Sequence, residues 1–504
     1  MYRQLLTHRE NFVSSPTSLP VPGDTRPMTE MPRSRARRAA QLGGFVGTEA
    51  VRRAAAKAAP GRTRPDEQVA AAEQARNALL AERLVAVLGT MRGAAMKLGQ
   101  MLSLVDPGLV PPAHRELFHS ALAALQDSAP PMAWDRMRTH LERELGAELG
   151  SVFAEFEPEP VAAASIGQVY RARLADGRRV AVKVQYPEIE AAVRADLKNL
   201  RVLLSAYRFV HPALDAPALA DEVQLRLEEE LDYRIEASNT RAMGEIFRGH
   251  PFIRIPDVHH ALSGQRVIVT EWLDGQPLRE AYTAAESERN RIAEILFRFY
   301  CGTTYLAGFF NGDPHPGNVL LLEDGSIGFL DFGLCMTVDA EAAAGELAAL
   351  RAAKTGDAER LLQLMEVRGF ARRSAVPAEQ AIEVFVRVFG WYLRDEPMRI
   401  GPDIANDVVA LLTVTGPGVS ARSFNLPAAH ALRGRAELQL LAILGQLGPR
   451  LNMHAVAREW LFGAEPVTEL GRAHRDWVAH RTGNAPSMPP TSVIFQPESR
   501  STVR

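Results

Sequence analysis

The 504-residue sequence contains only two cysteines, Cys301 and Cys335, and almost no net charge. Two thiols cannot form a disulfide framework or a cysteine-rich zinc site, and both lie in apolar surroundings, so we expect small core residues in a reducing compartment. The formal charge of −2 gives no reason to expect nucleic acid as a partner.

A long hydrophobic run is also missing. The most apolar stretch, 292–310, contains Glu294 and Arg298, and its uncharged part is too short to cross a bilayer. The first ten residues are charged, with no apolar run after them, so no secretory signal is predicted. We therefore expect a cytoplasmic protein without a transmembrane helix, for which peripheral contact with the inner face of the membrane stays open.

The length exceeds what one hydrophobic core usually holds, so at least two domains are expected. Residues 1–65 contain 12 Lys and Arg against four Asp and Glu. A solvated tail, a helix on anionic lipid and a nucleic-acid contact are all open for this segment, the solvated tail being favoured. The predicted divisions are a basic, partly disordered segment 1–66, a helical region 67–150, a mostly β region 151–274, a mostly helical region 275–480 and a disordered tail 481–504.

Two segments, 169–184 and 319–333, share the pattern of an apolar strand, Asp-Gly and a second apolar strand. Asp-Gly between such runs predicts a β-hairpin. Lys183 lies in the second strand of the first hairpin, so the residues before that hairpin are expected to cover phosphate groups. Backbone that approaches phosphate closely usually contains glycine, yet this loop reads Ala162-Ala163-Ala164-Ser165-Ile166-Gly167.

The segment 311–333, NGDPHPGNVLLLEDGSIGFLDFG, contains the clearest chemical pattern. Asp313 and Asn318 are five residues apart, as in the catalytic loop of protein kinases, and Asp331 opens an Asp-Phe-Gly triplet 13 residues later. Asp331 and Asn318 offer the hard oxygen ligands that Mg²⁺ prefers. Lys183 can hold the α- and β-phosphates of ATP or ADP, and Asp313 can accept a proton from an attacking hydroxyl or water.

A half-buried Lys183 also needs an acidic partner, because burial alone would favour the neutral amine. The helix predicted at 221–243 offers several carboxylates, and spacing does not choose among them.

Seven motifs in the order KLGQ, LQDSAPPM, AAASIGQVYRARL, VAVKVQYP, EEELDYRIEASN, GDPHPGN and DFG lie between Lys97 and Leu334. In this set the sequence resembles the UbiB/AarF family of atypical protein kinase-like proteins, and a weaker similarity continues to Asn452. The resemblance implies an α+β, bilobal protein kinase-like fold, with 151–274 as N-lobe and 275–480 as helical C-lobe. A helical N-terminal extension would carry the Lys-x-Gly-Gln motif, and a long helical region would follow at the C-terminus.

The resemblance also implies roles for single residues. Lys183 would be the nucleotide lysine and Glu236 its ion-pair partner. Ala162, Ala163, Ala164, Ser165 and Gly167 would form the family's alanine-rich phosphate cover, stiffer than a glycine loop, with Gly167 as its one flexible point. Glu271 and Leu273 would lie where a linker meets adenine. The motif residues with a regulatory role would be Lys97, Gln100, Glu230 and Asp232.

One position departs from the family pattern, which has His-Ala-Asp where this chain has Asn311-Gly312-Asp313. The support of the catalytic aspartate is therefore expected to differ. His315, within the same motif, is expected to bond to backbone rather than to transfer protons.

The function implied by the resemblance is an atypical kinase or ATPase that uses Mg-ATP on a small or lipid-like acceptor and supports isoprenoid quinone biosynthesis or lipid homeostasis. In the family the N-terminal extension fills the groove for peptides, so protein substrates are disfavoured. A nucleotide-binding pseudokinase scaffold and a conventional kinase for a small-molecule acceptor remain as alternatives. Self-association into a homodimer is open.

Overall fold

The computed structural model describes residues 132–164, 166–194, 197, 224, 228–371, 374, 376–413, 424 and 428–484. Several predictions lie outside these residues: the basic segment 1–66, most of the helical region 67–150 with Lys97 and Gln100, the loop residue Ser165, and most of the tail 481–504.

A five-stranded sheet follows two short helices in the first described part of the chain. Its strand order is β1-β3-β4-β6, and β2 pairs with β3 beside that path. The predicted hairpin is confirmed, because β3 and β4 pair antiparallel and Gly177 takes a φ of +88° in the turn between them. The elements are α5 (Trp134–Leu145), α6 (Leu149–Val152), β1 (Phe153–Phe156), β2 (Ala162–Ala163), β3 (Gly167–Leu174), β4 (Arg179–Gln185) and β6 (Val267–Glu271).

The two faces of β4 have different neighbours, as expected from the alternation of side chains along a strand. Val180, Val182 and Val184 are fully buried in one hydrophobic core, together with Met137 of α5. Lys183 is directed to the opposite face, where its ammonium group meets α9 (Tyr233–Ile246). The alternating pattern of β4 therefore determines that the single lysine of the strand faces the helix rather than the core.

A second, four-stranded sheet has the order β5-β10-β9-β7, and β8 pairs with β11 next to it. The second Asp-Gly hairpin is also confirmed, since β9 and β10 pair antiparallel and Gly325 has a φ of +80°. These strands position the polar motif: Asp313 follows β8, Asn318 precedes β9 and Asp331 follows β10. The elements are β5 (Ile253–Arg254), β7 (Gly275–Pro277), β8 (Phe309–Asn311), β9 (Val319–Leu322), β10 (Ile327–Phe329) and β11 (Cys335–Thr337).

Helices form most of the remaining chain, as predicted after Phe332. Their larger core includes the stacked rings of Phe299 and Phe329, whose centroids are 3.6 Å apart, so the hairpin of the polar motif is anchored in it. The helical segments are α10 (Glu286–Phe297), a π-helical turn (Arg298–Gly302), α11 (Thr303–Ala307), α12 (Ala340–Thr355), α13 (Ala358–Val367), α14 (Ala378–Leu393), α15 (Pro402–Thr413), α16 (Ala428–Leu447), α17 (Met453–Phe462) and α18 (Glu469–Asn484), and the short pair β12 (Met398–Arg399) and β13 (Arg450–Leu451) lies among them.

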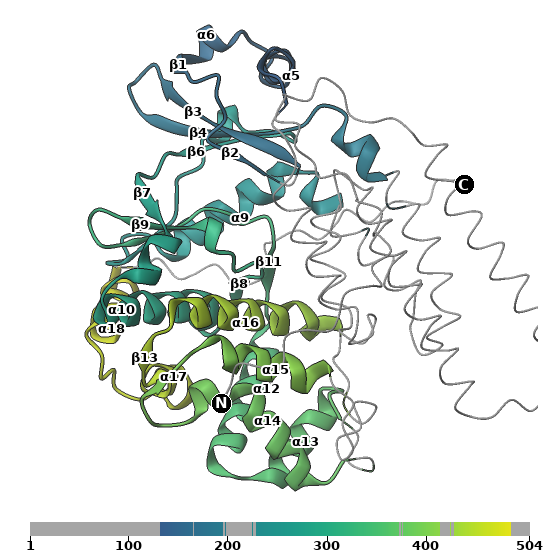
Figure 1. Ribbon diagram of the computed structural model, residues 1–504, viewed down its shortest axis with the longest axis vertical. Coiled ribbons are helices and arrows are strands. Elements are labelled where there is room, and N and C mark those ends of the chain that lie inside the picture. Colours follow the sequence, from purple (N-terminus) through teal and green to yellow (C-terminus); the bar gives the residue numbers. More distant parts are fainter. Residues whose placement is uncertain are drawn as a thin grey trace, which may run out of the picture.

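Figure 1 shows the five-stranded sheet at one end of the molecule, α12 to α17 at the other, and α9 between them. Two separate hydrophobic cores correspond to these ends. The first half of α9, with Tyr233 and Ala237, belongs to the sheet's core, whereas Met243 and Phe247 at its end belong to the helical core. The boundary at 274 stays a prediction, because the two cores alternate along the chain between 233 and 269.

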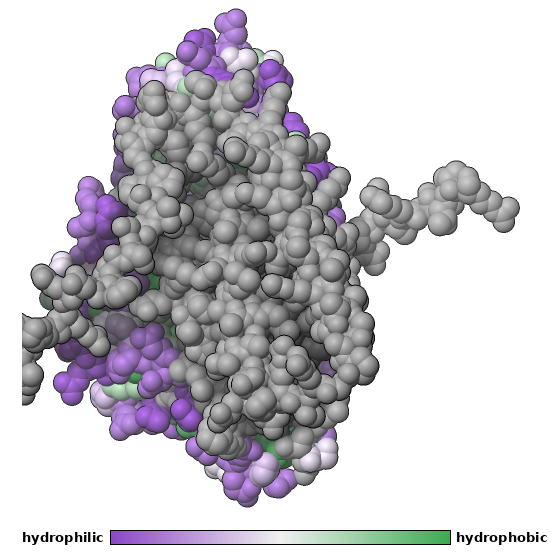
Figure 2. Space-filling view, turned by 45° about the vertical axis from the view of Figure 1, so that its right-hand side comes forward, coloured by the Kyte–Doolittle hydropathy of each residue, from purple (hydrophilic) through white to green (hydrophobic). Residues whose placement is uncertain are grey.

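The described surface is mostly polar where Figure 2 colours it, above all at its upper and lower ends. No helix among the described residues is long and apolar enough to cross a membrane. Both cysteines are free, with Cys301 buried and Cys335 partly buried, as predicted. Among the residues that the structure describes, the exposed large apolar side chains are Val161, Ile235, Val367, Phe462 and Val467.

Candidate functional site

Lys183, Glu236 and Asp331 form an ion-paired group at the junction of the sheet, α9 and the polar motif. The Nζ of Lys183 donates to both carboxylate oxygens of Glu236, at 2.8 and 2.9 Å, and to Oδ2 of Asp331 at 3.2 Å. Only 8% of the Glu236 side chain is exposed, against 34% for Asp331. Glu236 is therefore the buried partner of the lysine, and Asp331 faces the open side.

Burial and charge act in opposite directions on this group. Burial lowers the pKa of Lys183, but the carboxylates of Asp331 and Glu236 outweigh it and raise that pKa well above its usual value. Burial raises the pKa of Glu236 to about 7, against the opposing effect of Lys183. Lys183 is thus a cation near neutral pH.

Asp232 has a structural role that the motif alone did not reveal. It is the N-cap of α9, and its carboxylate accepts a hydrogen bond from the backbone N–H of Arg234 at 3.1 Å. An acidic N-cap stabilises the first turn of a helix, and that turn carries Glu236. Asp232 of the Glu-x-Asp motif therefore caps the helix that carries Glu236, the partner of Lys183.

Asn311, the residue that departs from the family pattern, links Asp313 to the Asp-Phe-Gly segment. Its Nδ2 donates to the backbone oxygen of Asp331 at 2.7 Å, and its Oδ1 accepts from the backbone N–H of Asp313 at 2.9 Å. Asn311 is only 3% exposed, so both bonds are shielded from water. The side chain of Asn311 thus fixes Asp313, the candidate base, relative to Asp331, a candidate metal ligand.

Asn318 is held beside Asp331 by the hairpin. Its backbone oxygen accepts from the N–H of Leu330 at 3.0 Å, one residue before Asp331. His315 begins the 3₁₀ turn Pro316–Asn318 and its Nδ1 accepts from the N–H of Gly317 at 3.1 Å. The expectation that His315 bonds to backbone is confirmed. The backbone pairing thus brings Asn318 close to Asp331, and amide and carboxylate oxygens are ligand types that Mg²⁺ prefers.

The backbone conformation explains why alanine suffices in the phosphate-cover loop. Ala162 and Ala163 form strand β2, paired antiparallel with Val169 and Gln168, and the N–H of Ala164 donates to the oxygen of Gly167 at 2.8 Å. No described residue of this loop has a positive φ, so none needs the freedom of glycine there. The hairpin pairing itself keeps the loop in place.

The expectation that Gly167 is a flexible point was wrong. Gly167 lies within β3, paired with Gln185, and it lacks a positive φ. A Cβ at this position would lie 2.2 Å from the backbone oxygen of Val184. Glycine is required because two strands approach each other closely, not because the chain bends there.

Replacing Gly167 by alanine should therefore destabilise the hairpin strongly. The clash is with backbone, which cannot rotate away, so we expect a loss of about 2 kcal/mol or more in the free energy of unfolding. Gly150→Ala in α6 is the matched control, because nothing lies within 4 Å of its Cβ position. Chemical denaturation of both variants would measure the difference, and equal stability of the two would contradict the steric explanation.

Glu271 and Leu273 lie at the end of β6 and just after it. The carboxylate of Glu271 pairs with Arg254 at 2.7 Å, and the Leu273 side chain packs near Gly328 of β10. Contact between this segment and adenine stays a prediction. For Glu271 the contact would have to use the backbone, since its side chain is held by Arg254.

Arg435 of α16 was missed in the sequence, although it contacts the candidate catalytic base. Its Nη2 donates to Oδ1 of Asp313 at 3.0 Å, and both side chains are buried, with 7% and 12% of their surfaces exposed. The two residues are 122 positions apart. No local spacing could have linked them. The only available signal was an arginine inside the weakly family-like segment RGRAELQLLAILGQLGPRLN.

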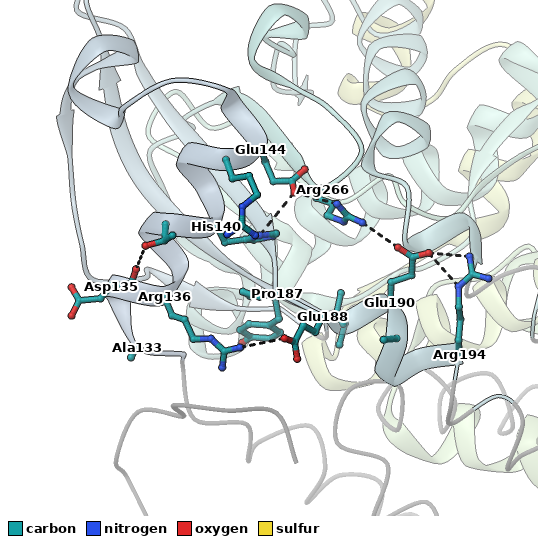
Figure 3. Close-up of a pocket in the computed structure, with 15 residues that line it drawn as sticks. Ala133, Asp135, Arg136, His140, Glu144, Pro187, Glu188, Glu190, Arg194 and Arg266 are labelled. Carbon is teal, nitrogen blue, oxygen red and sulfur yellow. Dashed lines mark hydrogen bonds and ion pairs between the residues drawn. The ribbon is translucent and has the colours of Figure 1, made fainter. Parts of the chain in front are cut away.

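A separate cavity of about 940 Å³ lies between α5 and the segment after β4. Figure 3 shows that its charged side chains are largely paired with one another: Arg266 bridges Glu144 and Glu190, and Arg194 also bonds Glu190. Because these charges largely neutralise each other, the cavity has no marked preference for an anion or a cation.

Comparisons with known proteins agree with the class that this geometry indicates, a kinase-like protein of mixed helices and sheets. A family model described as the ABC1 atypical kinase-like domain matches residues 124–365. The chain is 36% identical to AarF domain-containing protein kinase 1 of Xenopus tropicalis, over 48% of this chain and 46% of that protein. It is 33% identical to the mitochondrial atypical kinase COQ8B of Rattus norvegicus, over 66% of this chain and 63% of that protein.

A solved complex of a Mycobacterium tuberculosis protein with erythromycin is also similar, with 31% identity and a TM-score of 0.57 over 78% of this chain and 98% of that one. The matches span about a third to two thirds of the length of the first curated relatives. The chain belongs to the UbiB/AarF family of atypical kinase-like proteins, and the resemblance seen in its motifs is confirmed.

Proposed function

We propose that this protein is a Mg-ATP-dependent enzyme, an ATPase or a phosphotransferase for a small or lipid-like acceptor. The observation that carries the proposal is the convergence of five residues from three parts of the chain, β4, α9 and the segment 311–333. Lys183 is paired with Glu236 and Asp331, and Asn311 ties Asp331 to Asp313. A protein that only bound partners would not need this arrangement of a cation, a base and a metal-ligand pair.

Each residue has a definite task in phosphoryl transfer. Lys183 would bind phosphate oxygens, and Glu236 would hold its side chain in position. Asp331 and Asn318 would hold Mg²⁺, whose positive charge would balance the negative charge of the phosphates. Asp313 would orient the attacking oxygen and accept its proton.

The finer architecture is part of the same proposal. We infer a bilobal arrangement divided near 274, with the Lys-x-Gly-Gln extension of Lys97 and Gln100 packed over the site as the family resemblance implies. Such an extension would exclude peptides and favour a small or lipid-like acceptor. Support of isoprenoid quinone biosynthesis or lipid homeostasis at the inner face of a membrane is the setting that agrees with it.

A second candidate is a kinase for a small-molecule acceptor unrelated to lipids. The similarity to a mycobacterial protein solved with erythromycin favours it, because the shared region covers almost all of that chain. A nucleotide-binding scaffold is the third reading.

The first test is magnesium-dependent release of phosphate from ATP by the full-length protein, with anionic vesicles, with neutral vesicles and without lipid. Turnover that rises with anionic lipid would support the membrane-associated enzyme. Turnover stimulated only by a macrolide, with transfer of phosphate to it, would support the second candidate. Binding of Mg-ATP without turnover under any of these conditions would exclude both enzymes and support the nucleotide-binding scaffold.

A further inference from the structure

Two buried arginines of α16 differ in how completely their charges are balanced. Nη2 of Arg433 lies 2.7 Å from Glu346, and its Nη1 donates to Thr304 at 2.6 Å. Although burial lowers the pKa of Arg433, neighbours led by Glu346 raise it above the usual value. Its Nε makes no hydrogen bond with any described residue, but it lies 3.7 Å from the carboxylate of Glu437, so the charge of this arginine is balanced by two acidic side chains.

Arg435 has the opposite balance. Burial lowers its pKa, and the attraction of Asp313 and Glu230 offsets only part of that effect. Its Nη2 is bonded to Asp313, whereas its Nη1 is buried and has no hydrogen-bond partner among the described residues. A buried cationic N–H without an acceptor is costly, and an incoming anion would remove that cost.

The place of this unbonded group indicates which anion. Asp313 is the residue that would orient the attacking oxygen, so the guanidinium lies on the side of the site from which attack occurs. The loop from Asp313 to Asn318 contains no lysine or arginine. Lys183, beside Glu236 and Asp331, is the residue assigned to the α- and β-phosphates. A cation is therefore absent from the loop where charge develops on the transferred group, and α16 supplies one.

We propose that Arg435 is an arginine finger supplied by the same chain, whose Nη1 binds the phosphoryl group during its transfer; this rests on the proposed function. Figure 1 shows α16 running below β8 and β11. The side chain of Leu432 on α16 lies against Gly312, the residue before Asp313. In the step, the O–H oxygen of water or acceptor bonds to the γ-phosphorus as the bond to the bridging oxygen of ADP breaks. ADP leaves with that electron pair, Asp313 takes the proton, and Arg435 stabilises the negative charge on the phosphoryl oxygens.

The test compares Arg435→Gln and Arg435→Lys with the wild-type protein, using three ligands with Mg²⁺: ADP, ATP, and ADP with aluminium fluoride, which mimics the transferred group. We expect ADP affinity to change less than about threefold, while the aluminium fluoride complex weakens at least tenfold and ATP turnover falls about 10³-fold, the lower range known for arginine fingers. Lysine keeps the charge but loses the planar fork, so Arg435→Lys should retain an intermediate activity.

Arg433→Lys is the matched control, equally buried on the same helix. It should lower the melting temperature without changing the ratio of aluminium fluoride complex to ADP affinity. Equal loss of affinity for all three ligands in Arg435→Gln would overturn the proposal in favour of a purely structural role. Higher turnover in that variant would overturn it too, since Arg435 would then be restraining Asp313. A wild-type protein that binds none of the nucleotides would instead refute the proposed function, and the two failures are thus distinguishable.

Discussion

Replacing Asp331 by asparagine should reduce ATP turnover at least about 1,000-fold while the fold stays intact. The carboxylate is the only charged member of the proposed Mg²⁺ donor set, and a metal ion contributes several kcal/mol to stabilising the charge of a phosphoryl transition state. Each 1.36 kcal/mol of that stabilisation is worth a factor of ten in rate. Steady-state phosphate release at saturating ATP would measure the loss.

Stability should respond far less, because asparagine keeps the Oδ1 that accepts from the N–H of Gly333 at 2.9 Å, and Lys183 keeps its two bonds to Glu236. We expect a shift in melting temperature below about 3 °C. Asp476→Asn, an exposed position on α18, is the matched control and should retain full activity. A fully active Asp331→Asn protein would remove Asp331 from the proposed metal site.

Replacing Lys183 by methionine should instead damage both activity and stability. Methionine fills much of the same volume but leaves Glu236 facing Asp331 without a cation, and breaking a buried ion pair in this way costs about 3–5 kcal/mol. Urea denaturation would measure the loss. The double variant Lys183→Met with Glu236→Gln should recover part of it, because the stranded buried charge is then gone.

The pH dependence of the Lys183→Met deficit has a definite sign. In the wild-type protein, burial raises the pKa of Glu236 to about 7 while Lys183 opposes the rise; without Lys183 the pKa should be higher still. A carboxyl whose pKa is higher in the folded state binds a proton on folding, so its contribution favours folding at low pH and is lost as the pH rises. The deficit relative to wild type should be largest above pH 7 and shrink toward pH 5; a deficit independent of pH would contradict this explanation.

The parts of the fold that the sequence predicted correctly depend on local signals. Asp-Gly between apolar runs predicted both hairpins, since their turns need a positive φ and their strands follow within a few residues. The kinase-like spacing of Asp313, Asn318 and Asp331 marked the polar motif, and the hairpin predicted between Asn318 and Asp331 is present. The partner of Lys183 needed more than spacing: several carboxylates lay on one predicted helix, and only the family resemblance selected Glu236, which the structure places in contact with the lysine.

The parts that could not be predicted depend on contacts between distant residues. Arg435 reaches Asp313 only because α16 packs below β8, and no pattern near either residue records that packing. Gly167 was misinterpreted because a glycine in the sequence can mean either a flexible turn or a close approach between two strands, and the sequence does not distinguish them. Asn311 was noticed as a departure, but one of its two hydrogen bonds is to the backbone of Asp331, 20 residues away.

The shared helix α9 has a consequence for motion within the molecule. Its first turns belong to the core of the five-stranded sheet and its last turns to the helical core, so neither core can rotate against the other without tilting it. Such a tilt would move Glu236 relative to Lys183, which is fixed in β4. The distance between their charged groups would then report the angle between the two ends of the molecule, and any ligand that changed that angle would also shift Glu236 against Lys183.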